Sequence, residues 1–130
     1  MNKYRYAWGV KRASFVLIPL FILNYIGIVM HLYSAFWWWD IFTHFLGGIG
    51  LGFLVYGVVI HNTPKNWGID RVWLIWLLTL FCIFLGWELY EIIISQYLNR
   101  ELFYNIDTLH DIINDLLGAL VAYYWTREFL

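Results

Sequence analysis

The sequence predicts an all-α polytopic membrane protein with four transmembrane helices and both termini in the cytoplasm. Of its 130 residues, 62% are hydrophobic and only 13% are charged, whereas about 25% of the residues in a soluble domain carry a charge. Several apolar runs approach the roughly 20 residues that a helix needs to cross a bilayer. Lysine and arginine gather on one side of these runs. We therefore expect residues 1–130 to form a single transmembrane domain.

Four apolar runs bounded by polar residues define the predicted spans. The first, Ser14 to Tyr33, follows a basic segment, but its apolar core is longer than the roughly 7 to 15 residues of a secretory signal. We interpret it as an uncleaved helix. The second, Ile41 to Ile60, follows the interface-type tryptophans Trp37–Trp39. The third is Val72 to Ser95, and the fourth is Thr108 to Trp125.

The distribution of basic residues predicts the orientation, because loops rich in lysine and arginine stay in the cytoplasm. A cytoplasmic N-terminus leaves only Arg100 on the outer side. It places the other basic residues on the inner side: Lys3, Arg5, Lys11, Arg12, Lys65, Arg71 and Arg127. We expect the protein in a prokaryotic plasma or inner membrane.

Charge and cysteine content exclude two further classes of function. The net charge of −1 supplies no basic patch for nucleic acid. The single cysteine, Cys82, forms no intrachain disulfide and cannot build a cysteine-based zinc site. The small residues Gly48 and Gly52 form a G-x-x-x-G match that favours close helix packing, within the protein rather than between copies.

An acidic cluster is the most unusual feature of the spans. With the predicted orientation, most carboxylates and three of the histidines, His31, His44 and His110, fall at the outer level. Charged residues inside a bilayer are costly and are usually functional. Arg100 alone cannot neutralise the outer acids, which are Asp40, Glu88, Glu91, Glu101, Asp107, Asp111 and Asp115.

Helical spacing predicts which of these side chains share a face, since residues three or four positions apart lie together. Asp40 and His44 are four residues apart, and Glu88 and Glu91 are three apart. One stripe on the fourth span presents three carboxylates, spaced four residues apart: Asp107, Asp111 and Asp115.

Carboxylates combined with imidazole suit hard or borderline divalent metals. We therefore predict a divalent metal cofactor whose identity stays open. The candidate ligands are Asp40, His44, Glu88, Asp107, Asp111 and Asp115, and Glu91 is the candidate general base. Two other interpretations stay open: the same groups could form a proton or ion path, or they could hydrogen-bond one another and only fasten the helices.

Three short motifs then resemble a known pattern. They are Asp40-Ile-Phe-Thr-His44-Phe, Trp87-Glu88-Leu-Tyr-Glu91, and Asp107-Thr-Leu-His-Asp111 followed by Gly118-Ala119. Their order resembles the YjdF-like family of predicted inner-membrane proteins and, more distantly, the VanZ-like membrane proteins. Where the family commonly has lysine after the first aspartate this chain has Ile41, and Asp115 stands where an asparagine or small residue is expected. The resemblance implies a membrane class and a candidate site, without a settled activity.

These observations leave several functions open. The leading hypothesis is a metal-dependent hydrolase or transferase that acts on a lipid or polyprenyl phosphate, with metal-activated water as the nucleophile. The alternatives are a proton or cation carrier and a non-catalytic membrane accessory protein. Membrane lipid is the expected partner, no nucleic acid is expected, and homo-oligomerisation stays open.

Overall fold

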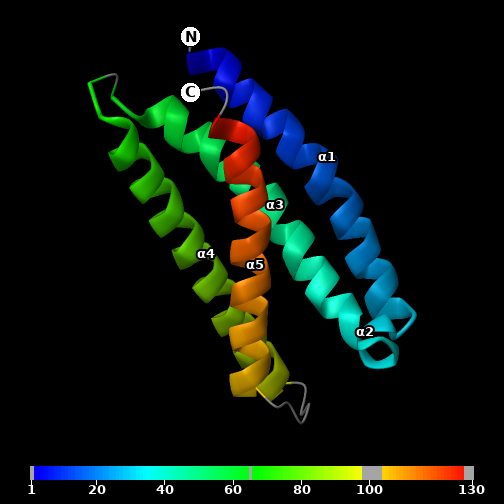
Figure 1. Ribbon diagram of the computed structural model, residues 1–130. Helices are drawn as coiled ribbons and strands as arrows, with labels where there is room; N and C mark the ends of the chain where they lie inside the picture. Colours follow the sequence, from blue (N-terminus) through cyan, green and yellow to red (C-terminus); the bar gives the residue numbers. More distant parts are fainter. Residues whose placement is uncertain (1, 65, 98–103, 128–130) are drawn as a thin grey trace.

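The computed structural model describes residues 2–64, 66–97 and 104–127, which form a bundle of α-helices (Figure 1). The start of α1 and the end of α5 lie at one end of the bundle, here called the terminal end. The short helix α2 and the start of α5 lie at the opposite end, here called the distal end. The helices are α1 (Asn2–Val29), α2 (Leu32–Ala35), α3 (Trp37–Asn62), α4 (Ile69–Tyr97) and α5 (Tyr104–Thr126).

The helices extend beyond most of the predicted span limits. α1 begins at Asn2 rather than at Ser14. A helix can continue into its charged flank as long as its backbone N–H and C=O groups form hydrogen bonds. α1 ends at Val29, before the predicted limit at Tyr33. The reason is local: His31 has the left-handed backbone angles φ 54° and ψ 33°, which interrupt a right-handed helix.

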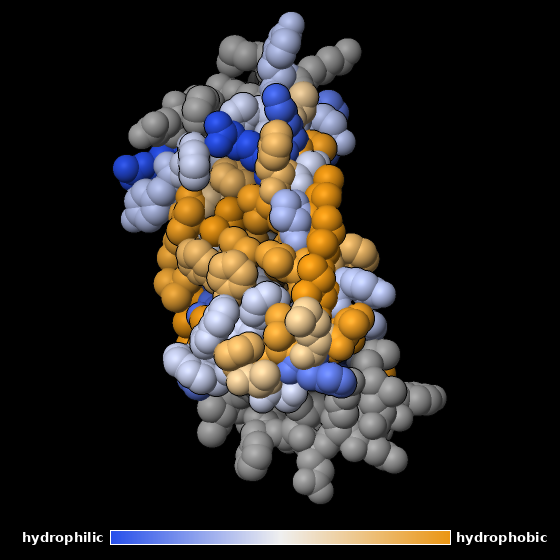
Figure 2. Space-filling view, turned by 90° about the vertical axis from the view of Figure 1, so that its right-hand side faces the viewer, coloured by the Kyte–Doolittle hydropathy of each residue, from blue (hydrophilic) through white to orange (hydrophobic). Residues whose placement is uncertain are grey.

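Three of the described helices have the length and apolar composition to cross a membrane, over Tyr6–Val29, Trp37–Val59 and Ile69–Ile93. Figure 2 shows an apolar band across the molecule, with strongly hydrophilic residues above it and residues of mixed hydropathy below it. Large apolar side chains are exposed along α1 and α4, including Phe21 and Leu78, as expected for a surface in contact with lipid. The structure thus supports three of the four predicted spans.

Helix α3 lies between α1 and α5, and glycines allow both neighbours to approach closely. On the α1 side, a Cβ built at Gly9 would lie 2.8 Å from the Cα of Gly57. On the α5 side, a Cβ at Gly52 would lie 2.6 Å from the Cβ of Ala122. The G-x-x-x-G match at Gly48 and Gly52 therefore serves packing inside the bundle, as the sequence predicts.

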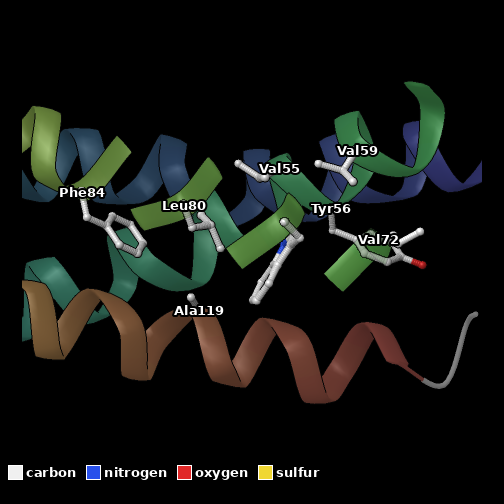
Figure 3. Close-up of a cluster of buried hydrophobic side chains, with 8 residues drawn as sticks. Val55, Tyr56, Val59, Val72, Leu80, Phe84 and Ala119 are labelled. Atoms are coloured by element: carbon white, nitrogen blue, oxygen red, sulfur yellow. The ribbon is translucent and has the colours of Figure 1, made fainter. Parts of the chain in front are cut away.

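An apolar cluster fills the space between α3, α4 and α5 toward the terminal end (Figure 3). Trp76 of α4 is buried there, and its indole nitrogen donates a 2.9 Å hydrogen bond to the carbonyl oxygen of Gly52 on α3. The cluster comprises Val55, Tyr56, Val59, Val72, Trp76, Leu80, Phe84 and Ala119.

Cation–π contacts join α1 to α5 at the terminal end. The guanidinium carbon of Arg12 lies 4.5 Å from the ring centroid of Trp8 and 5.1 Å from that of Trp125. Such contacts stabilise a cation at a membrane interface by about 0.5–1 kcal/mol at exposed sites. The tryptophans thus act here as anchors between helices, at the end of the molecule where the basic residues gather.

Candidate metal centre

Four side chains from three helices meet near the distal end of the bundle. His44 comes from the second turn of α3, Glu88 and Glu91 from the far part of α4, and Asp111 from the second turn of α5. One ligand atom from each of the four lies within 4.8 Å of the others. These helices are far apart in sequence, so the site depends on their packing rather than on a local motif.

The imidazole of His44 is the centre of this group, and its two nitrogens face different carboxylates. Nε2 lies 3.6 Å from Oδ1 of Asp40 and 3.8 Å from Oδ1 of Asp111. Nδ1 lies 3.4 Å from Oδ2 of Asp115. The i,i+4 pair of Asp40 and His44 on α3 is therefore extended across the helix interface by two carboxylates of α5.

Burial separates these side chains into two groups. His44 is 8% exposed, and Glu88, Asp111 and Asp115 are each 4% exposed. Glu91 is half-buried, at the edge of the group. Oε1 of Glu88 is buried and has no hydrogen-bond partner in the part of the chain that the structure describes. A buried polar atom without a partner costs about 1–3 kcal/mol, and more if the group is charged.

Glycines bring α5 against α3 at the level of the site. A Cβ built at Gly48 would overlap the carbonyl oxygen of Asp115, and a Cβ built at Gly118 would overlap the carbonyl oxygen of Phe45. Any larger residue at either position would push the two helices apart. The distances between His44 and the α5 carboxylates therefore depend on these two glycines.

A second polar network, which the sequence patterns do not predict, lies beside the acidic group. The hydroxyl of Tyr33, in α2, donates a 2.5 Å hydrogen bond to Oδ1 of Asn24 in α1. Burial raises the pKa of the Tyr33 phenol above its ordinary value of 10.0, and the carboxylates of Asp40 and Glu91 act in the same direction. The phenol therefore stays protonated and can keep donating. The available signal was Asn24, an amide inside an otherwise apolar run.

Of the predicted metal ligands, His44, Glu88 and Asp111 are brought together with the predicted base Glu91. Asp40 lies next to them on the Nε2 side of His44, whereas Asp115 lies on the Nδ1 side. The side chain of Asp107 lies outside the described residues, as do Glu101 and Arg100. The histidines that the sequence places at the same level, His31 and His110, are exposed and lie outside the four-residue group.

The donor atoms of this group suit a divalent cation. One imidazole nitrogen and three carboxylates match the preference of borderline metals such as zinc, manganese and iron. In helical bundles, di-metal carboxylate sites also use inward glutamates and histidines from facing helices. The residues present therefore fit a metal ion, and the unpartnered oxygen of Glu88 is a donor atom that a metal would satisfy.

Comparison with known families places the chain in one of them. Residues 3–129 match the family described as predicted membrane protein (DUF2238), and the chain therefore belongs to that family. The YjdF-like resemblance is consistent with this membership, whereas the VanZ-like resemblance stays a prediction. No curated protein and no solved structure matches the chain.

Proposed function

We propose that this member of a family of predicted membrane proteins holds a divalent metal ion inside its helical bundle. The ligands are Nε2 of His44 and carboxylate oxygens of Glu88 and Asp111, with Asp40 and Glu91 at the edge of the same group. Glu88 carries this proposal: one of its carboxylate oxygens belongs to the group of converging ligand atoms, and its buried Oε1 has no hydrogen-bond partner among the described residues.

Electrostatics supports a cation over purely structural polar contacts. A charged carboxylate costs roughly 2.5–3.5 kcal/mol at the centre of a membrane-spanning helix on insertion scales, and less toward the helix ends. Glu88 and Asp111 are almost fully buried, and a neighbouring imidazole carries at most one positive charge. A divalent ion coordinated by both carboxylates would offset their burial and satisfy the remaining oxygen lone pairs.

The topology we propose has four spans, with α5 as the fourth and both ends in the cytoplasm. α5 has 23 residues, or about 35 Å at 1.5 Å per residue, and its polar residues Asp111 and Asp115 are buried against the bundle. The basic residues Arg12 and Arg127 lie at the terminal end, which supports a cytoplasmic terminal end. The metal site then lies in the outer half of a prokaryotic plasma or inner membrane.

The chemistry that fits such a site is metal-dependent hydrolysis or group transfer on a lipid or polyprenyl phosphate. A bound divalent ion holds phosphate oxygens and lowers the pKa of a coordinated water. Glu91 is half-buried at the edge of the group, so a substrate can reach it more easily than it can reach Glu88. We assign Glu91 the role of general base on this ground.

A carrier function has less support. Between the metal group and the terminal end, the described residues of α3, α4 and α5 pack as the apolar cluster that includes Leu80 and Phe84. A proton or ion path needs polar groups or water along its length, and this cluster interrupts it.

The test is the metal content of the detergent-purified protein after loading with zinc or manganese and identical washing. We expect near-stoichiometric metal in the wild type and its loss in His44→Ala and Asp111→Asn. Two matched controls, His110→Ala and Asp70→Asn, change an exposed histidine and an exposed acid and should keep the metal. Folding is checked by size-exclusion profile and thermal unfolding. A folded wild type that retains no metal would overturn the proposal.

If metal is present, lipid phosphates are the first substrates to screen. Phosphate release from undecaprenyl or phosphatidyl phosphates in mixed micelles should require the metal and should fall in Glu91→Gln, which keeps the ligands of the buried group. Metal retention without any turnover by the wild type would leave a binding protein and remove the enzymatic part of the proposal.

A further inference from the structure

Asp115 stands apart from the other carboxylates of the site. Its Oδ2 lies 3.4 Å from Nδ1 of His44, whereas Asp40 and Asp111 lie on the Nε2 side of the same ring. Asp111 and Asp115 are one helical turn apart on α5, and both are 4% exposed. Two acids on one stripe thus approach opposite edges of one imidazole.

We propose that Asp115 is a positioning residue that accepts a hydrogen bond from Nδ1–H of His44 and so directs Nε2 toward the metal. This inference rests on the proposed metal site. A neutral imidazole carries one proton, and the nitrogen that keeps the proton cannot bind a metal ion. A carboxylate at Nδ1 therefore fixes both the tautomer and the orientation of the ring.

The helix interface holds Asp115 in place for this role. Gly48 allows the backbone of α5 to approach α3 at the carbonyl oxygen of Asp115, and a Cβ built at Gly47 would lie 3.8 Å from Oδ1 of Asp115. The carboxylate is thus confined between the α3 backbone and the imidazole. The separation of 3.4 Å is slightly longer than the usual N–H···O distance of about 2.7–3.2 Å, so the proposed hydrogen bond requires the two groups to approach by a few tenths of an ångström.

The four-residue spacing between Asp111 and Asp115 on α5 gives the two carboxylates different roles at His44. Asp111 faces the metal side of His44, and Asp115, four residues later, faces the other side, so one helix supplies both a ligand and the partner of another ligand. Carboxylate partners of this kind raise the basicity of the ligating nitrogen, and removing them typically lowers metal affinity 10- to 100-fold.

The first readout is zinc affinity of the full chain in detergent micelles. Asp115→Ala should bind zinc about 10- to 100-fold more weakly than the wild type. Asp115→Asn should lose less, because its amide oxygen still accepts a hydrogen bond. Asn114→Ala, at the preceding position of α5, is the matched control and should match the wild type.

The second readout is the ¹⁵N spectrum of the histidine rings in the zinc-loaded wild type, with His44 assigned by comparison with His44→Gln. We expect zinc on Nε2 and a proton on Nδ1. Equal zinc affinity in all Asp115 variants would overturn this inference and leave the proposed function standing. Zinc on Nδ1 would overturn this inference and also the assignment of Nε2 as the His44 ligand atom, while the metal site itself would stand. A folded wild type that binds no zinc would overturn both. The wild-type spectrum also decides the matter if Asp115→Ala fails to fold.

Discussion

The two ends of the bundle bury different kinds of side chains. At the terminal end, α3, α4 and α5 bury apolar and aromatic side chains, and the one buried indole of that cluster, Trp76, donates its hydrogen bond to Gly52. At the distal end, the same three helices bury His44, Glu88, Asp111 and Asp115, and one glutamate oxygen has no partner in the described structure. The terminal end therefore buries mainly apolar side chains, whereas the distal end buries an imidazole and several carboxylates, whose donor atoms a cation would satisfy.

The largest expected effect is the stabilisation of the folded protein when metal binds at the distal end. At a free zinc concentration a thousand times the wild-type Kd, binding stabilises the folded state by about 4.1 kcal/mol. Glu88→Gln should lose most of this gain, because an amide is a poor ligand for zinc. Without metal, it should be at least as stable as the wild type, since it removes a buried charge. Thermal unfolding with and without zinc measures both effects, and an equal zinc shift in the two proteins would contradict the assignment of Glu88.

Adding a side chain at the contact between α3 and α5 should destabilise the distal end. Gly48→Ala places a methyl group against the backbone of Asp115, and overpacking of this kind costs about 1–3 kcal/mol. Because the helices separate at the level of His44, zinc affinity should fall together with stability. Zinc titration and thermal unfolding of the same sample test this coupling, and a destabilised variant with unchanged affinity would break it.

A change at the terminal end should affect stability alone. Trp76→Phe removes the hydrogen bond to the carbonyl oxygen of Gly52 and leaves a small void, so we expect a loss of about 1–2 kcal/mol in the free energy of unfolding. Zinc affinity should stay within about twofold of the wild type, since additive behaviour is usual for sites that share no partner. A large loss of affinity would show that the two ends are coupled.

The smallest expected effect is a gain in the free energy of unfolding. A Cβ at Gly86 of α4 would meet nothing within 4 Å, so Gly86→Ala only improves helix propensity, by about 0.5–1 kcal/mol. It is also the matched control for Gly48→Ala. Unfolding in detergent at fixed micelle concentration measures the gain, and a destabilised Gly86→Ala would indicate that this face of α4 packs against something absent from the single chain.

Much of this architecture follows from the sequence, because membrane helices obey simple physical limits. Apolar length located the helices, and the predicted orientation placed Asp40, Glu88 and Asp111 at the same level. Periodicity put Asp111 and Asp115 on one face, and in the structure both approach His44. These are local properties of a helix, so they do not depend on how the helices pack.

What could not be predicted depends on tertiary packing. Spacing alone makes Asp111 and Asp115 equivalent, and only the approach of α5 to α3 assigns them to different nitrogens of His44. The contact between Tyr33 and Asn24 likewise requires the turn at His31, whose left-handed backbone angles have no signal in an apolar run. The start of α1 at Asn2 was missed because hydropathy reports where lipid begins, not where helical hydrogen bonding begins.

The glycine contact between α3 and α5 also determines when the site can exist during synthesis. α5 leaves the ribosome after α3 and α4, and it carries Asp111 and Asp115. Until it inserts, His44 and Glu88 lack their α5 partners, and the groove beside Gly48 and Gly52 is open to lipid. The arrival of α5 covers these glycines and brings its carboxylates to His44 in one step. A product truncated before α5 would therefore lack both the packing of α5 on α3 and the two carboxylates that face His44.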